Sequence, residues 1–158
     1  MMRHTLTVRV RDDAAMLDRV VSLLRRRGVA VQSLVVGRSE AAGVSRLTLV
    51  VDVHDASLVV RQLRRLIGVL AVRDVTHASP VERETALLRV SAPALSAAAL
   101  AALAHGAGAR VVHAGDTAAI LEITDRPDQI SAFVEDARAL GTVEVARTGC
   151  IAIGREDE

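Results

Sequence analysis

Two hydrophobic patterns follow one another along this chain. In short segments apolar and polar residues alternate, and in longer segments apolar residues recur every three or four positions. Alternation predicts a strand, and the longer spacing predicts an amphipathic helix. In the first half the pattern predicts two helices that begin after the N-caps Asp12–Asp13 and Asp55 and end at Gly28 and Gly68. The strands predicted there are 5–11, 29–35, 47–53 and 69–76.

The second half repeats this order of elements. Its predicted helices run from Pro93 to about His105 and from Pro127 to Gly141. Its predicted strands are 86–90, 109–113, 118–124 and a last extended stretch over 143–153. Each half is therefore a split βαββαβ unit, and we predict an α+β protein with two tandem ferredoxin-like modules. We place the modules at 1–78 and 80–158, with a linker at Ala78–Pro80.

The predicted strands of the first module carry apolar residues on both faces. Leu34 and Val36 break the alternation in the second strand, Val50 in the third, and Leu70 and Val72 in the fourth. Helices cover one face of such a sheet, so the other face needs a different cover. Large exposed apolar patches usually mark interfaces, and we predict that this module forms a homodimer.

The composition is that of a globular chain. Apolar residues make up 51% of the 158 residues, Phe133 is the sole aromatic, and Cys150 is the sole cysteine. One cysteine excludes an internal disulfide, and we expect a reducing, cytoplasmic compartment. No run approaches the ~18 apolar residues of a membrane span, and the N-terminus alternates instead of showing the apolar core of a signal peptide.

The formal net charge of +1 hides an asymmetry, because residues 1–79 carry +6 and residues 80–158 carry −5. A basic half is one signature of nucleic-acid binding. Single-strand binders, however, use aromatic stacking platforms, and this half has no aromatic residue. We therefore expect no nucleic-acid partner.

Candidate catalytic or metal-binding groups do not form a constellation in the sequence. The five histidines show no metal-ligand spacing, and we expect them at the surface. The carboxylate pairs Asp12–Asp13 and Asp125/Asp128 fit helix caps, and Cys150 fits a buried, inert thiol. The sequence predicts no catalytic residue, no metal site and no cofactor of its own, so we expect no enzymatic activity.

The turn Asp12–Ala15, between the first strand and the first helix, is the best candidate for a ligand site. A helix N-terminus offers unpaired N–H groups that suit a carboxylate, and Asp12 can accept an ammonium group. Together they can hold the zwitterionic end of an amino acid. The alternative is that Asp12 and Asp13 only cap the helix.

The repeated unit, with its capped turn after the first strand, resembles the ACT domain, a small amino-acid-sensing module. A closer resemblance runs through both halves, to the regulatory (small) subunit of acetolactate synthase. The stretches that carry it are 25–34 (RRRGVAVQSL), 45–51 (SRLTLVV), 62–75 (QLRRLIGVLAVRDV), 81–84 (VERE) and 144–149 (EVARTG).

This resemblance implies a non-catalytic subunit that binds and activates a large catalytic subunit. That partner uses thiamine diphosphate, Mg²⁺ and FAD to condense pyruvate with a second 2-oxo acid, the first common step toward valine, leucine and isoleucine. The small subunit also confers feedback inhibition, usually by valine. The alternative is a free-standing ACT module that controls another enzyme or a transcription factor.

In the family, valine lies between two ACT domains. The residues that the resemblance implies are Asp12, Asp13, Ala14, Ala15, Met16 and Leu17 from one copy and Ala30 and Val31 from the other. This chain has Ala15 where the family usually has Gly, and Ala30 where it usually has Asn. A Gly position with φ > 0 would make Ala15 unfavourable, and otherwise its methyl group crowds the ligand. A missing amide at Ala30 costs about 1–3 kcal/mol, so we expect weakened or lost valine sensitivity.

Overall fold

The computed structural model describes residues 1–93 and 95–155, which form two units. The first unit is Met1–Val81 together with the segment that begins at Cys150, and the second is Glu82–Gly149. The boundary near residue 81 lies just beyond the predicted linker at Ala78–Pro80. The predicted module 80–158 differs from this division at its far end, because the last segment groups with the first unit.

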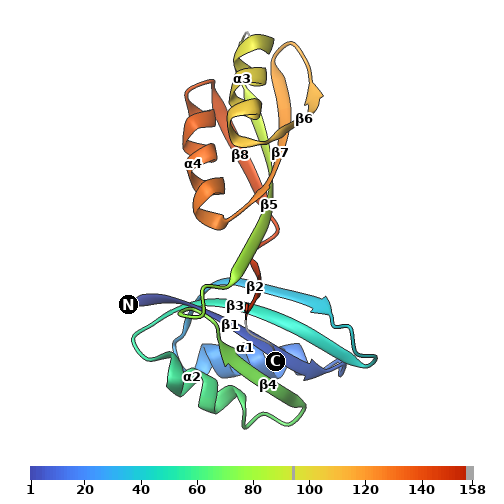
Figure 1. The fold of residues 1–158 in the computed structure, drawn as a ribbon, viewed down its shortest axis with the longest axis vertical. Coiled ribbons are helices and arrows are strands. Elements are labelled where there is room, and N and C mark those ends of the chain that lie inside the picture. The colour runs from blue at the N-terminus through green and yellow to red at the C-terminus, as the bar shows by residue number, and fades with distance from the viewer. Residues whose placement is uncertain (94, 156–158) are drawn as a thin grey trace. The chain divides into compact units, whose positions relative to one another are not determined.

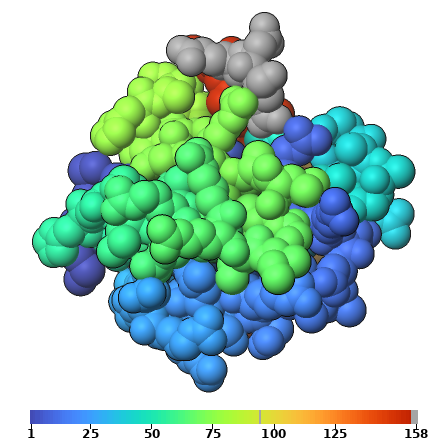
Figure 2. All heavy atoms as spheres, turned by 90° about the horizontal axis from the view of Figure 1, so that it is seen from below, coloured from blue at the N-terminus to red at the C-terminus, as the bar shows by residue number. Residues whose placement is uncertain are grey.

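The first unit is a four-stranded antiparallel sheet with two helices on one face (Figure 1). The strand order is β2-β3-β1-β4, so β2 and β4 are the edges. The elements are β1 (Met2–Arg11), α1 (Met16–Arg26), β2 (Ala30–Arg38), β3 (Val44–Val53), α2 (Ala56–Leu63) and β4 (Val69–Asp74). Figure 2 views the helical layer from outside, where α1 (blue) and α2 (green) lie at the surface. The predicted order of elements is confirmed.

The core of this unit follows from strand alternation. Leu6 pairs with Leu49 and Val8 with Val72, and all four side chains are buried. They pack under the apolar faces of the helices, where Val20 and Leu63 are the fully buried examples.

The helix ends agree with the sequence in two places and differ in two. The Asp55 carboxylate caps α2 by accepting from Ser57 N at 2.8 Å. Gly28, directly after the C-cap of α1, has a φ of 62°, as a helix-ending glycine requires. The predicted end of α2 at Gly68 is wrong, because the helix ends at Leu63 and Gly68, with a φ of 93°, lies in the turn before β4. The predicted caps Asp12–Asp13 are wrong as N-caps of α1. That position belongs to Ala15, because Asp13 forms a separate tight turn before the helix.

The opposite face of the first sheet is partly covered by the C-terminal segment, which includes β9 (Ile151–Ile153). Cys150 N donates to Ser33 Oγ at 3.1 Å, and Arg46 Nη2 donates to the Ala152 carbonyl at 3.3 Å. Cys150 and Ala152 are buried, and so is Val50, the direct partner of Ser33 in the β2–β3 register. Burial against this face explains why the segment leaves the second module to which the sequence assigned it.

The second unit repeats the architecture, with its strands in the order β6-β7-β5-β8 and helices α3 and α4. Its elements are β5 (Val81–Ser91), α3 (Ala97–Ala107), β6 (Arg110–Ala114), β7 (Ala118–Asp125), α4 (Pro127–Arg138) and β8 (Thr142–Arg147). Two antiparallel α+β units with this order confirm the predicted fold class. The predicted last stretch over 143–153 is instead divided between β8 and β9.

The start of α3 differs from the prediction. The helix begins at Ala97 and not at Pro93, because the Ser96 hydroxyl accepts from Ala99 N at 3.2 Å and supplies the N-cap. Pro127 does occupy the first turn of α4, as predicted. The φ of 159° at Gly141 and its closeness to the Ser91 carbonyl leave no room for a Cβ there.

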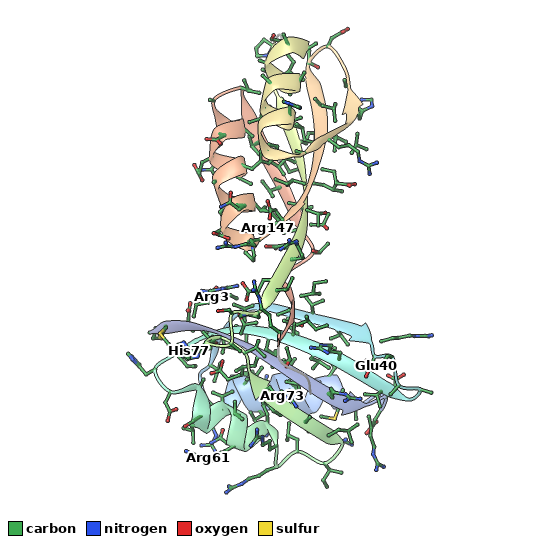
Figure 3. The ribbon with its side chains drawn as sticks, in the orientation of Figure 1. Arg3, Glu40, Arg61, Arg73, His77 and Arg147 are labelled. Carbon is green, nitrogen blue, oxygen red and sulfur yellow. The ribbon has the colours of Figure 1, made fainter. Side chains whose placement is uncertain are left out.

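A partly buried ion pair links β5 and β8 of the second unit to α4. Glu84 on β5 is 7% exposed, and its two oxygens lie 3.1 and 2.8 Å from Nε and Nη2 of Arg147 on β8. Arg147 also donates to the Pro127 carbonyl at 3.1 Å and to Ser131 Oγ at 3.3 Å, both on α4. Figure 3 labels Arg147 in this unit.

Candidate effector site

The turn after β1 is fixed by its first residue, Asp12. Its backbone N–H donates to the Gly43 carbonyl at 2.8 Å, and its Oδ1 accepts from Ser45 Oγ at 3.0 Å. Both partners lie at the start of β3. The Asp12 carboxylate is thus anchored through one oxygen, and the residue itself is exposed at this end of the sheet.

Asp13 is committed to the fold of the turn. Its Oδ1 accepts from Ala15 N at 3.0 Å and its Oδ2 from Arg19 Nη1 at 2.8 Å. The backbone hydrogen bond from Ala15, followed by the Arg19 guanidinium, lowers the pKa of Asp13 below its ordinary value. Asp13 therefore orients the turn and has little capacity left for a ligand.

The backbone conformation of Ala15 shows whether alanine is strained at the position where the family usually has glycine. Its φ of −84° and ψ of −5° are ordinary for any residue, so Ala15 carries no backbone strain. The remaining consequence of Ala15 is steric, through its methyl group.

Of the next residues, Met16 and Leu17 face different ways. The Met16 side chain is 2% exposed and belongs to the core, so its side chain is not available to a ligand. Leu17 is 44% exposed. Among the described residues, the amides of Leu17 and Asp18 have no acceptor, as expected in a first helical turn. Ala14, also predicted for the site, is exposed in the turn.

Ala30 and Val31 lie at the other end of the sheet. Ala30 pairs with Asp52 and Val31 with Val51, whereas Arg11, next to the turn, pairs with Val44. Eight residues of β3 separate the two positions, which corresponds to about 26 Å at ~3.3 Å per residue. One copy of the chain therefore does not bring together the two groups of residues predicted for the site.

His4 corrects the expectation that all five histidines are at the surface. It is 5% exposed, and its Nδ1 lies 3.1 Å from Asp74 Oδ2. Its buried Nε2 has no hydrogen-bond partner among the described residues. The signal was present in the sequence, because alternation places residue 4 on the same inward face as Leu6 and Val8.

The remaining candidate groups lie elsewhere in residues 1–93 and 95–155. Cys150 is buried, as predicted. No group of three or more His, Cys, Asp or Glu side chains in this part of the chain is arranged to hold a metal ion. None of its helices has both the length and the apolar character needed to cross a membrane. No local pattern predicts the Glu84–Arg147 pair, whose members are 63 positions apart.

These features define a class: a chain of two ferredoxin-like α+β units, the first of ACT type. Residues 6–71 match the family model for the AHAS small subunit-like ACT domain, and residues 83–156 match that for the small subunit of acetolactate synthase. The chain belongs to the acetolactate synthase small subunit family.

Individual relatives agree over almost the whole length. The chain is 39% identical over 156 residues to a probable acetolactate synthase small subunit of Archaeoglobus fulgidus, covering 98% of each chain. It is 32% identical to the acetolactate synthase small subunit of Bacillus subtilis, covering 98% of this chain and 91% of the relative. The crystal structure of the acetolactate synthase small subunit from Thermotoga maritima superposes with a TM-score of 0.88 at 27% identity, covering 100% of both chains.

Proposed function

We propose that this chain is the non-catalytic regulatory subunit that binds and activates the catalytic subunit of acetolactate synthase and mediates feedback inhibition by valine. The family match supports it, because it spans both units and extends well beyond the ACT domain. The same extent disfavours the alternative of a free-standing ACT module, which would need only the first unit. The thiamine diphosphate, Mg²⁺ and FAD of the reaction belong, on this proposal, to the catalytic subunit.

The observation that carries the effector part is the separation of the two groups of site residues. A site built from both groups needs two copies of the chain. The edge strand β2 is suited to pairing with a second copy, since Val31 and Val36 on it are 42% and 47% exposed. A homodimer through this unit is therefore part of the proposal.

In a two-fold symmetric dimer, pairing through β2 would bring the two groups of site residues close together. When two β2 strands pair antiparallel, Ala30 of one copy lies at the Arg38 end of the other. Arg38 pairs with Ser45, whose hydroxyl holds Asp12. The start of β2 in one copy thus approaches the turn of its partner, and each dimer forms two such sites.

The chemistry of the turn fits a small amino acid. The free amides at Leu17 and Asp18 can receive the carboxylate of valine, and the second oxygen of Asp12 can accept from its ammonium group. The exposed side chains of Leu17 and Val31 supply apolar surface for the isopropyl group. Asp13 holds the turn in place, and Ala14 and Met16 contribute backbone alone.

The departures at Ala15 and Ala30 weaken this site. The Ala15 methyl group narrows the space above the first helical turn, although the backbone is relaxed. Ala30 provides no side-chain amide to a buried polar group of the ligand, which costs about 1–3 kcal/mol, or roughly 5- to 150-fold in affinity. We therefore expect weak valine binding.

The test is the activity of the purified catalytic subunit with and without this chain, each with a valine titration. Activation is expected, together with inhibition that needs valine concentrations well above those sufficient for a site with Asn at position 30. Ala30→Asn should strengthen valine binding at least fivefold by calorimetry. Val112→Asn, which alters an exposed strand residue of the second unit, is the control. No activation would contradict the regulatory role, and an unchanged affinity in Ala30→Asn would contradict the location of the pocket.

A further inference from the structure

The edge strand β4, opposite β2, borders a groove of its own. Among residues 1–93 and 95–155, β4 pairs with β1 alone within its sheet, so its other side is open to this part of the chain. A groove of about 430 Å³ runs along it, lined by Arg64 and by residues 69–73. An extended peptide can add to such an edge through its main chain.

The main chain of β4 is turned toward this groove at alternate residues. Val75 N donates to the Thr5 carbonyl on β1 at 3.0 Å, so the strand alternation directs Val72 and Asp74 away from β1. The Val72 carbonyl accordingly accepts from Arg64 Nη2 at 2.8 Å. In the isolated chain the Arg64 guanidinium therefore occupies the Val72 carbonyl at the open edge. The main-chain N–H of an added strand can replace this hydrogen bond.

The side chains around the groove combine apolar and cationic character. Leu70 is 49% exposed, and Ile67, at the corner between α2 and β4, is 86% exposed. Arg64 and Arg73 border the groove, and neither has a carboxylate partner among the described residues. Figure 3 labels Arg73 on β4. Exposed apolar groups flanked by arginines are typical of a protein-binding surface.

Charge decides which occupant fits. A second copy pairing through its own β4 would gather Arg64 and Arg73 of both copies along one shared edge, which like-charge repulsion disfavours. An extended segment with carboxylates satisfies the same guanidinium groups through paired hydrogen bonds. The surface therefore favours an acidic partner of a different kind.

We propose that the β4 edge surface, defined as Arg64, Ile67, Leu70 and Arg73, docks an extended acidic segment of the catalytic subunit as an added strand. This inference rests on the proposed function, because it names the surface through which the regulatory chain holds its partner. The two edges of the first sheet then have separate tasks: β2 joins two copies, and β4 binds the catalytic subunit.

The test compares two double variants of the full chain in binding to the purified catalytic subunit. The edge variant, Leu70→Ser with Arg73→Glu, should weaken binding at least about tenfold and remove most of its salt dependence. The control variant, Leu58→Ser with Arg61→Glu, makes the same changes on α2, where Leu58 is 47% exposed, and should bind within about twofold of the unchanged chain. Wild-type affinity in the edge variant, or an equal loss in the control, overturns the proposal.

Two further measurements distinguish strand addition at β4 from the alternative that β4 joins two copies of the chain. Hydrogen exchange of the peptide containing residues 69–74 should slow when the catalytic subunit is added, because the Val72 and Asp74 amides acquire acceptors; no slowing overturns strand addition. Sedimentation should show the edge variant with the oligomeric state of the unchanged chain, and a shift to monomer would make β4 the interface between copies instead. Failure of the unchanged chain to bind or activate the catalytic subunit would contradict the proposed function itself, whatever the variants do.

Discussion

The partly buried pair Glu84–Arg147 allows a stability prediction with a defined magnitude. Arg147→Met removes the guanidinium and leaves the Glu84 carboxylate, 8% exposed as a side chain, without its partner. Breaking a buried pair in this way typically costs about 3–5 kcal/mol. Because the Arg147 side chain is 35% exposed and water can reach its place, we expect a value near the lower limit, about 3 kcal/mol.

A double-mutant cycle isolates the pair from the packing of the arginine stem. Glu84→Gln with Arg147→Met leaves no unpaired charge, and should recover a substantial part of the loss seen in Arg147→Met. The free energy of unfolding of Arg147→Lys should lie between those of the unchanged chain and Arg147→Met. An ammonium group keeps the charge but cannot bond both carboxylate oxygens and the Pro127 carbonyl in the same fork geometry.

The assay must report on the second unit, because two units need not unfold together. The chain has no Trp or Tyr, so far-ultraviolet circular dichroism in urea replaces fluorescence, and hydrogen exchange of α4 gives the local free energy of opening. The control is Arg138→Met, which removes the exposed pair with Glu135 on the same helix and should cost less than about 0.5 kcal/mol. A loss below about 1 kcal/mol in Arg147→Met, or a double variant no more stable than that single one, would refute the reasoning.

Two other predictions concern the first unit. The lowered pKa of Asp13 means that its contribution to stability is present above the ordinary Asp pKa of about 4 and is lost as pH falls through the folded-state value. Asp13→Asn should therefore melt below the unchanged chain near neutral pH, with the difference in Tm vanishing in acid; a difference independent of pH would contradict the account. Ala152→Asp should destabilise the first unit by about 2 kcal/mol or more in urea, since it places a carboxylate in a position that is 6% exposed. Ile153→Asp, at 56% exposure, should change little, and equal effects would show that the C-terminal segment does not cover the sheet.

The C-terminal segment that covers the first sheet also affects binding experiments with a fragment of the chain. Residues 1–79 alone lack the segment whose Cys150 bonds Ser33 and lies beside Val50. Such a fragment exposes apolar surface that the intact chain buries. Failure of the fragment to bind a partner would then reflect lost cover as readily as a missing docking surface, so tests of docking need the full chain.

The order of elements and the inward-facing residues could be predicted from the sequence because they depend on local geometry. A strand alternates every two residues and a helix repeats every 3.6, so the pattern predicts the buried side of residues 6–10 and of Val20 and Leu24 without reference to the rest of the chain. Leu17 and Val21, on the same apolar stripe of the helix, are 44% and 43% exposed. Asp55 and Gly28 act within one helical turn, and both were predicted. His4 was wrongly expected at the surface, although the alternation of the residues around it predicts the burial that the structure shows.

Tertiary structure decided which distant segments meet. The register of β1 and β2 on β3 places Ala30 far from the turn that begins at Asp12, so one copy of the chain does not bring these two predicted parts of the site together. The fold also pairs Glu84 with Arg147 and carries the segment after Gly149 back onto the first sheet. The Glu84–Arg147 and Ser33–Cys150 contacts join residues more than sixty positions apart, and each depends on burial and hydrogen bonding supplied by many other residues. A local periodicity specifies which face of an element is buried, but not the surface against which that face packs.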